Sequence, residues 1–245
     1  MPVRAFCSLL SGGKDSTYAL HKALDEGLAP ACIGIVVPGR PDSWMFHRPF
    51  VEFVPLQLNA MGLSGLSYEI RVSGEKEKEV EELKESLARA KEVRAFDTLV
   101  IGGIASRYQL TRFRMIAEEL GLRIYDPQWG MDPEAYMYEL LRYGIIYIIT
   151  QITTAGLPYR LLGVPINSEG LVREIIELAQ KHGFHPAFEG GEAETFVIKA
   201  PRYSGGICLE AKRVRVSEFE YRLEPISATL CDRPRVTIDG VMYEA

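Results

Sequence analysis

The sequence predicts an α/β protein, in which a mostly parallel sheet with helices on its faces is followed by a smaller α+β domain. Short apolar runs alternate with amphipathic segments through the first half, which is the pattern of βαβ units. A Ser-Gly-Gly turn joins the first apolar run to the first helical segment. After Trp129 the pattern changes to longer alternating or β-branched runs. We therefore predict two domains, at residues 1–128 and 129–245.

In the first domain, short apolar runs predict strands, and apolar residues at helical spacing predict helices. Glycines that follow three of the helical segments, Gly27, Gly62 and Gly121, mark their ends. The expected strands span 3–10, 31–37, 68–72, 98–102 and 123–125. The expected helices span 16–26, 49–61, 74–93 and 106–120. Because ligands of parallel sheets bind beyond the carboxyl ends of the strands, the loops at those ends should converge on one site.

The second domain is expected to mix helices and strands. Ser168 is a typical helix N-cap and Gly183 a typical helix end, so they bound one of its helices. The expected helices span 132–143 and 168–182, and the expected strands span 145–151, 196–200, 207–223 and 235–238. A cleft between the two domains is the natural place for a substrate.

Composition narrows the class of protein. A chain of 245 residues with 47% hydrophobic and 25% charged residues can bury a globular core. The formal net charge of −5 disfavours a nucleic-acid partner held by bulk electrostatics. The longest apolar stretch, residues 143–149, is too short to span a membrane.

The four cysteines, Cys7, Cys32, Cys208 and Cys231, include no Cys-x-x-Cys pair. With no signal peptide, the sequence predicts a reduced, cytoplasmic protein. Cys7 and Cys32 lie in apolar runs and are expected in the core.

The most informative motif is the turn after the first strand. It reads Ser11-Gly12-Gly13-Lys14-Asp15-Ser16. Glycines let a ligand approach the backbone, and a helix N-terminus with exposed N–H groups attracts phosphate. The common P-loop is excluded, because Ser8 and Asp15 stand where that pattern needs Gly and Ser or Thr. The alternative interpretation is an ordinary glycine turn at a strand–helix junction.

A second motif, at residues 189–197, places three carboxylates and two glycines before a strand. Its polar and glycine positions are Glu189, Gly190, Gly191, Glu192, Glu194 and Thr195. In an extended segment Glu192 and Glu194 point to the same face, where they could hold Mg²⁺, bind a cation or act as a base. A charged edge strand is the structural alternative.

Together these motifs resemble those of the diphthine–ammonia ligase (diphthamide synthase) family of pyrophosphate-loop (PP-loop) ATP pyrophosphatases. Four further stretches resemble elements of that family, and they lie at 43–47, 74–79, 102–109 and 127–130. The resemblance runs from residue 4 to about residue 200 and leaves the last 45 residues without a recognised motif. It implies a HUP/Rossmann-like parallel sheet that carries the PP-loop.

The resemblance implies an ATP-dependent amidation. The substrate would be diphthine, a modified histidine of elongation factor 2 that bears a carboxylate and a trimethylammonium group. ATP and Mg²⁺ would activate the carboxylate as an acyl-adenylate with release of pyrophosphate, and ammonium would supply the amide nitrogen of diphthamide.

The resemblance also implies roles for residues of the nucleotide half. Lys14 would stabilise the leaving pyrophosphate, and Asp15 would contact Mg²⁺. His47 could contact phosphate or move a proton, or it is simply a polar loop residue. The remaining nucleotide-binding residues would be Ser11, Gly12, Gly13, Ser16, Val36, Val37, Gly102, Gly103 and Ser106. For Ser106, helix capping alone is the alternative.

In the substrate half, Tyr108 and Trp129 would receive the trimethylammonium by cation–π contact, unless they only pack in the core. Glu192 and Glu194 are the candidate catalytic carboxylates. The full set of expected substrate-binding residues is Tyr108, Gln109, Trp129, Glu189, Gly190, Gly191, Glu192, Glu194 and Thr195. His21, on the first helix, is expected on the surface.

Other functions remain open at this level. A PP-loop enzyme could adenylate a small-molecule carboxylate or transfer RNA, although transfer-RNA thiolation is disfavoured by the missing cysteine pair. A non-catalytic module that binds adenine nucleotides is a further alternative. Homo-oligomerisation is left open, and no membrane partner is expected.

Overall fold

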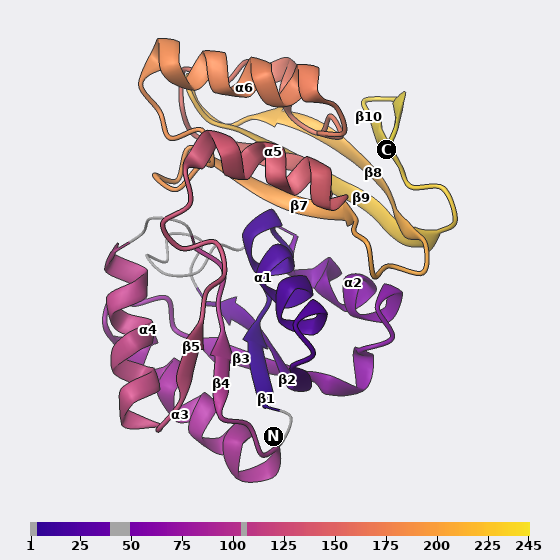
Figure 1. Ribbon diagram of the computed structural model, residues 1–245. Coiled ribbons are helices and arrows are strands. Elements are labelled where there is room, and N and C mark those ends of the chain that lie inside the picture. The colour runs from indigo at the N-terminus through magenta and orange to yellow at the C-terminus, as the bar shows by residue number, and fades with distance from the viewer. Residues whose placement is uncertain (1–3, 40–49, 104–106) are drawn as a thin grey trace.

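The computed structural model describes residues 4–39, 50–103 and 107–245. Figure 1 shows two layers, with the first half of the chain below and the second half above. Each layer is built on its own sheet, and helices α1 (Lys14–Asp25) and α2 (Val54–Ala60) lie between the two sheets. The predicted α/β class, with a parallel sheet followed by an α+β unit, is confirmed.

The first sheet is wholly parallel, with strand order β3-β2-β1-β4-β5. Its strands are β1 (Ala5–Leu9), β2 (Ala29–Pro38), β3 (Ser67–Val72), β4 (Thr98–Val100) and β5 (Arg123–Tyr125). The chain winds outward from β1 in one direction and then returns to the other side of β1 through β4. The β1/β4 boundary is therefore a topological switch point, the place where doubly wound sheets bind ligands.

Helices cover both faces of this sheet, as a parallel sheet requires. One apolar cluster joins the strands to α1 and α2, and another joins them to α3 (Lys78–Val93) and α4 (Arg107–Glu119). The segment expected to be one helix at 49–61 is divided between η1 (Val51–Phe53) and α2, and another short turn, η2 (Ser64–Leu66), follows.

The second sheet has six strands in the order β11-β10-β8-β9-β6-β7 and is mostly antiparallel. Helices α5 (Pro133–Tyr143) and α6 (Glu169–His182) pack on it, with the short turn η3 (Tyr159–Leu161) between them in sequence. Asp132 and Ser168 cap these helices, and Gly144 and Gly183 end them. The strands are β6 (Ile146–Ile152), β7 (Ala193–Lys199), β8 (Gly206–Arg215), β9 (Tyr221–Cys231), β10 (Arg235–Ile238) and β11 (Val241–Glu244).

One apolar cluster extends across both layers. Tyr18, Phe50 and Ala60 come from the first half of the chain but are buried among side chains of the second sheet. Phe50 also contacts Phe196 of β7, with ring centroids 5.5 Å apart. Because this contact is dry and apolar, we expect the two layers to behave as one unit rather than as two mobile domains.

Two expectations for the last 45 residues are corrected. The predicted strand at 207–223 is a hairpin of β8 and β9, whose turn is closed by the bonds of Val216 and Ser217 N–H to the Glu220 carbonyl. Strand β11 was not expected, although Asp239-Gly240 before it is a dipeptide typical of tight hairpin turns. At 207–223 the alternation continued through the turn, so the pattern alone did not show where the chain reverses.

The cysteines divide into two pairs. Cys7 and Cys32 are buried and lie opposite each other on β1 and β2, as expected for core residues. Cys208 and Cys231 form a disulfide between β8 and β9, so the expectation of four reduced cysteines is wrong for this pair. The hairpin brings together two cysteines that are 23 residues apart, which sequence spacing could not show.

His21 is fully buried, so its expected surface position is wrong. Its ring lies between α1 and the second half of the chain, 6.3 Å from Tyr143 and 6.0 Å from Tyr203 by centroid. The Nδ1 atom lies 2.9 Å from the Thr17 carbonyl oxygen. Burial lowers the pKa of His21 to about 4 and outweighs the opposing effect of that bond.

None of the helices in the described part of the chain combines the length and the apolar surface that a membrane crossing needs.

The depressed pKa of His21 predicts a pH-dependent contribution to stability. Between pH 6.5 and 4 the unfolded chain binds a proton that the folded chain does not, so this contribution is complete above pH 6.5 and is lost as pH falls to about 4. Once the pH has fallen to about 4, this contribution to the free energy of unfolding has decreased by about 3 kcal/mol. We expect His21→Gln to remove it, measured as the variant-minus-wild-type difference in free energy of unfolding across this pH range. The matched control is His182→Gln, on the exposed end of α6; equal differences for both variants would contradict the assignment.

Candidate active site

A cavity of about 180 Å³ lies at the β1/β4 switch point, between the first sheet and the segment that precedes β7. Its polar lining comes from the PP-loop, from Gln109 and from the acidic segment, and its apolar lining comes from both layers. The lining residues are Leu9, Leu10, Ser11, Gly13, Lys14, Asp15, Ser16, Val36, Ile101, Gly102, Gln109, Phe113, Phe188, Glu189, Gly191, Ala193, Glu194 and Thr195. The two motifs, nearly 180 residues apart in sequence, therefore meet in one cavity.

The PP-loop holds its shape through its own side chains. Ser11 and Ser16 hydroxyls lie 3.0 Å apart, and the Ser11 N–H donates to the Ser16 hydroxyl at 3.2 Å. Gly12 has a φ of +85°, and a side chain there would overlap Val54 of α2. The first turn of α1, which starts after Gly13, has no side-chain cap. The N–H groups of Asp15 and Ser16 in this turn, with the positive end of the helix dipole, can therefore attract an anion.

Gly102, at the end of β4, packs directly on the start of α1. A Cβ atom at this position would overlap the backbone of Asp15 and Ser16, so only glycine allows the approach. The Gln128 amide donates to the Asp15 carbonyl from the other side, at 3.1 Å. Two segments that follow β4 and β5 therefore fix where the loop ends and the helix begins.

Strand β7 of the second sheet is bonded to the PP-loop. The Val197 N–H donates to the Gly12 carbonyl at 2.9 Å, and the Lys14 N–H donates to the Thr195 hydroxyl at 3.2 Å. The Gln57 amide, fully buried on α2, donates to both the Gly12 and the Val197 carbonyls at 2.9 Å. Gln57 was not predicted, because a single glutamine in an amphipathic helix gives no sign that it faces a loop.

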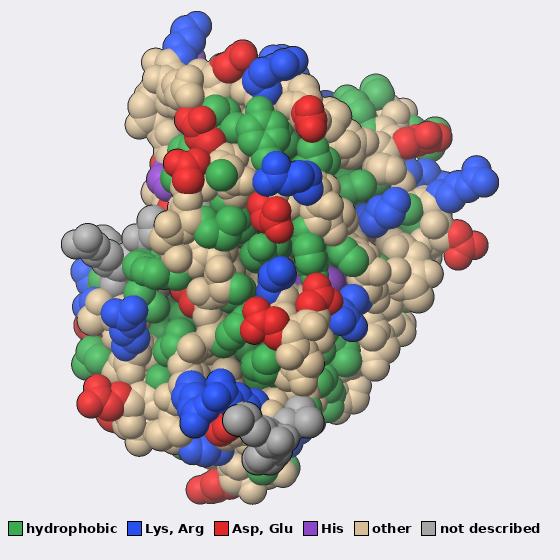
Figure 2. Space-filling view, viewed as in Figure 1, with side chains coloured by type: hydrophobic (Ala, Val, Ile, Leu, Met, Phe, Trp, Pro, Cys, Tyr) green, Lys and Arg blue, Asp and Glu red, His purple; other side chains and the backbone are tan. Residues whose placement is uncertain are grey.

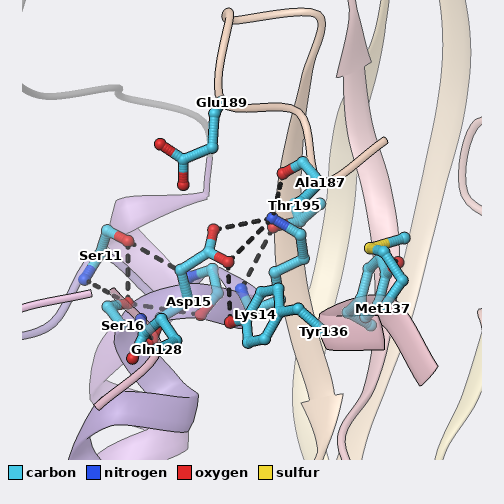
Figure 3. Close-up of polar contacts among 12 residues, drawn as sticks. Ser11, Lys14, Asp15, Ser16, Gln128, Tyr136, Met137, Ala187, Glu189 and Thr195 are labelled. Atoms are coloured by element: carbon cyan, nitrogen blue, oxygen red, sulfur yellow. Dashed lines mark hydrogen bonds and ion pairs between the residues drawn. The ribbon is translucent and has the colours of Figure 1, made fainter. Parts of the chain in front are cut away.

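Lys14 and Asp15 form an ion pair at the centre of the cavity (Figure 3). The Lys14 ammonium is buried, lies 2.7 Å and 3.0 Å from the two carboxylate oxygens of Asp15, and donates to the Ala187 carbonyl at 2.7 Å. It also lies 5.5 Å from the centroid of the Phe188 ring. The Asp15 side chain is 25% exposed and accepts a further bond from the Tyr136 hydroxyl at 2.9 Å. Neither Tyr136 nor Ala187 was predicted, since both come from the second layer.

The acidic segment separates into two kinds of carboxylate. Glu192 accepts bonds from the N–H groups of His185 and Gly190, each at 2.9 Å, and does not line the cavity. Glu189 and Glu194 do line it, and Figure 3 shows Glu189 above the PP-loop with its carboxylate turned toward Asp15. Glu192 lies in the turn before β7 and not in the strand, so the expected face shared by Glu192 and Glu194 is not formed there.

The loop that carries Glu189 is also held by His185. Its Nδ1 accepts N–H bonds from Ala187 and Glu189, at 3.3 Å and 3.5 Å. Burial, reinforced by the charge of Lys14, lowers the pKa of His185, which keeps the ring neutral and Nδ1 free to accept. The loop is thus built around two acceptors, His185 and Glu192, while Glu189 lines the cavity.

Asp126, directly after β5, is an additional titratable group near the site. The pKa of Asp126 is raised to about 7, mainly by burial and also by the negative charges of Glu189 and Asp15, against the lowering effect of a bond from the Gly103 N–H. Below neutral pH the folded chain therefore holds a proton on Asp126 that the unfolded chain releases. This uptake opposes that of His21 in the same pH range, so only a difference between variants isolates either group.

The remaining predicted residues lie at different places. Val36 and Gln109 line the cavity, whereas Gly12, Val37, Gly103, Tyr108, Trp129 and Gly190 do not. Arg112 stacks on the Tyr108 ring at 3.7 Å, and the Tyr108 hydroxyl donates to Glu77 at 3.1 Å. Trp129 packs against the core of the first sheet. His47 and Ser106 lie outside the described residues. The aromatic rings that line the cavity instead are Phe113 and Phe188, which were not predicted.

The donor set suits a magnesium ion that is shared with phosphates. Within residues 4–39, 50–103 and 107–245, no three His, Cys, Asp or Glu side chains gather as a complete metal site. Mg²⁺ is commonly held by one or two carboxylates together with substrate phosphates and water. Asp15, partly exposed at the foot of the uncapped helix, can supply such a carboxylate.

Comparisons with known proteins agree with this geometry. Residues 4–124 match the family model of the diphthamide synthase N-terminal domain, and residues 132–225 match that of its C-terminal domain. A Bos taurus protein named diphthine–ammonia ligase is 28% identical over 227 residues, which are 84% of this chain and 83% of the relative. A Danio rerio protein of the same name is 29% identical, over 83% of this chain and 85% of the relative. The resemblance seen in the motifs is therefore confirmed, and the chain belongs to the diphthamide synthase family.

Proposed function

We propose that this chain amidates the carboxylate of diphthine on elongation factor 2, using ATP, Mg²⁺ and ammonium. One observation carries the proposal: a phosphate-binding loop and a pair of cavity-facing glutamates, Glu189 and Glu194, line the same cavity. A phosphate site alone would suit any ATP-dependent enzyme. The glutamates add recognition of a cation, and diphthine carries a cation close to the carboxylate that must be activated.

The nucleotide half follows from the PP-loop. The N–H groups of Asp15 and Ser16 in the first turn of α1, together with the Ser11 and Ser16 hydroxyls, can donate to phosphate oxygens, and Lys14 supplies a positive charge. To reach phosphate, the Lys14 ammonium exchanges the Asp15 carboxylate for the incoming oxygens. Mg²⁺, held by Asp15, would neutralise phosphate charge as the pyrophosphate leaves. The apolar wall of Leu9, Val36 and Ile101 is suited to the adenine ring.

For the substrate half we propose to keep Glu189 and Glu194 from the residues that the sequence indicated and to replace Tyr108 and Trp129 by Phe188. Neither Tyr108 nor Trp129 lines the cavity: Tyr108 stacks on Arg112, and Trp129 packs against the core of the first sheet. Phe188 does line the cavity, next to Glu189. We therefore assign the trimethylammonium to Phe188 with Glu189 and Glu194, a combination of ring and carboxylates that suits a quaternary amine.

The chemistry takes two steps. In the first, a diphthine carboxylate oxygen attacks the α-phosphorus of ATP, and pyrophosphate leaves with the electrons of the broken P–O bond. In the second, ammonia, formed when ammonium loses a proton, attacks the acyl carbon and loses another proton, and AMP leaves. Positively charged groups at the PP-loop act on the first step, where negative charge collects on the departing pyrophosphate.

A role in transfer-RNA modification gains no support from the surface. Figure 2 shows Lys and Arg side chains interspersed with Asp and Glu over the face in view, rather than gathered into one basic field. The net charge of the chain is −5. Polyanion binding depends on local basic charge, which this face does not concentrate.

The direct test is the purified chain with ATP, Mg²⁺, ammonium and diphthine-bearing elongation factor 2. We expect pyrophosphate release that requires the modified protein, and a substrate mass change that corresponds to replacement of the carboxylate by the amide. Elongation factor 2 that lacks diphthine is the control. Equal pyrophosphate release with both protein substrates would refute the proposal.

Lys14→Met should lower kcat by about 10²- to 10³-fold, the usual effect of removing one group that stabilises a transition-state charge. Methionine keeps most of the buried stem packing, so the thermal midpoint should change far less than activity. The matched control is Lys22→Met on the same helix, whose ammonium faces Tyr18 and Tyr143 away from the cavity. Similar losses of activity in the two variants would remove Lys14 from the mechanism.

Glu189→Gln and Glu194→Gln should each raise the KM for the diphthine substrate about tenfold, equivalent to about 1.4 kcal/mol, with ATP affinity unchanged. Glu192→Gln should instead lower stability by about 1 kcal/mol, because its carboxylate bonds two backbone N–H groups. Substrate titrations and chemical denaturation separate the two effects. A rise in KM confined to Glu192→Gln would reverse the assignment.

A further inference from the structure

We propose that Tyr136 is a positioning residue for Asp15, which it holds so that one carboxylate oxygen remains available to a magnesium ion on the ATP phosphates. The inference rests on the proposed function and extends it, since it gives the second layer a part in metal binding. It was not evident in the sequence, where Tyr136 is one apolar-face residue of a predicted helix.

The geometry divides the two oxygens of the Asp15 carboxylate. The Tyr136 hydroxyl donates to Oδ1 at 2.9 Å, while the Lys14 ammonium lies 2.7 Å from Oδ2 and 3.0 Å from Oδ1. Among the described residues, Tyr136 and Lys14 are the two side chains that donate hydrogen bonds to this carboxylate. Figure 3 shows both side chains joined to the Asp15 carboxylate by dashed lines.

Only one of these two contacts has to break when nucleotide binds. Lys14 is expected to leave Oδ2 for the phosphates, and this exposes the oxygen that the metal would take. The bond from Tyr136 is on Oδ1 and does not compete. A hydrogen bond of this kind fixes the orientation of a ligating carboxylate, and losing it commonly weakens metal affinity by about 10- to 100-fold.

The tyrosine is well placed to act as a permanent donor. It is fully buried on α5, and its ring meets the edge of the Tyr18 ring with centroids 5.5 Å apart, so its orientation is fixed by packing. The hydroxyl has one proton to donate, and the fixed ring directs it to the Asp15 carboxylate.

The test is Tyr136→Phe, which removes the hydroxyl and keeps the ring. We expect the affinity for a non-hydrolysable ATP analogue, measured by calorimetry with Mg²⁺, to fall by about 10-fold or more, and the Mg²⁺ concentration needed for half-maximal turnover to rise similarly. Affinity for the same analogue with EDTA should stay unchanged. The matched control is Tyr147→Phe, an equally buried tyrosine whose hydroxyl faces the Met137 sulfur.

The double variant Asp15→Asn/Tyr136→Phe separates positioning from general packing. If Tyr136 acts through Asp15, adding Tyr136→Phe to Asp15→Asn should cause no further loss of Mg²⁺-dependent affinity. An additional loss, equal loss with EDTA, or an unchanged Mg²⁺ requirement in Tyr136→Phe would each overturn the inference.

The two levels of proposal fail differently. If Asp15→Asn abolishes Mg²⁺-dependent binding while Tyr136→Phe has no effect, the proposed function stands and the positioning role is wrong. If neither Asp15→Asn nor Lys14→Met alters ATP binding or pyrophosphate release, the proposed function itself is wrong.

Discussion

The site depends on the backbone bond between β7 and the PP-loop. The Gly12 carbonyl accepts hydrogen bonds from Val197 and from Gln57. One oxygen atom therefore links the PP-loop to a strand of the second sheet and to a helix of the first layer. With this carbonyl held, the start of α1 faces the cavity, and its Lys14 N–H bonds the Thr195 hydroxyl. The same strand carries Glu194 and Thr195 into the lining. The PP-loop and the acidic segment are thereby held in fixed relation by one short stretch of chain.

Much of the first layer was predictable because its signals are local. The five parallel strands and the helix ends at glycines follow from short-range pattern, and the PP-loop lies at the carboxyl end of β1, where the sequence placed it. The close packing of Gly102 on Asp15 shows why a glycine follows β4, although only the three-dimensional structure shows which backbone it meets. Local sequence pattern therefore indicated where the candidate site lies but not which packing contacts hold it in place.

What could not be predicted comes from contacts between the layers. His21 looks like a surface residue of an amphipathic helix, yet a second core covers it. Three glutamates in six residues look alike in sequence, but the loop uses the carboxylate of Glu192 to satisfy its own N–H groups and leaves Glu189 and Glu194 to the cavity. Backbone geometry decides which glutamate of an acidic cluster stabilises the loop and which one lines the cavity. Residue type alone does not encode that geometry.

The burial of Lys14 has a consequence for how charge enters the site. Its ammonium has already given up water for a carboxylate and a carbonyl oxygen, so the dehydration of the lysine is part of folding rather than of nucleotide binding. Arrival of a phosphate then amounts to counter-ion exchange between fixed partners. Surface lysines lose much of their attraction for anions when salt is added. An exchange between buried charges is less sensitive to salt, because dissolved ions screen buried charges weakly. Nucleotide affinity in this chain should therefore vary little with ionic strength, because the binding charges are buried before the nucleotide arrives.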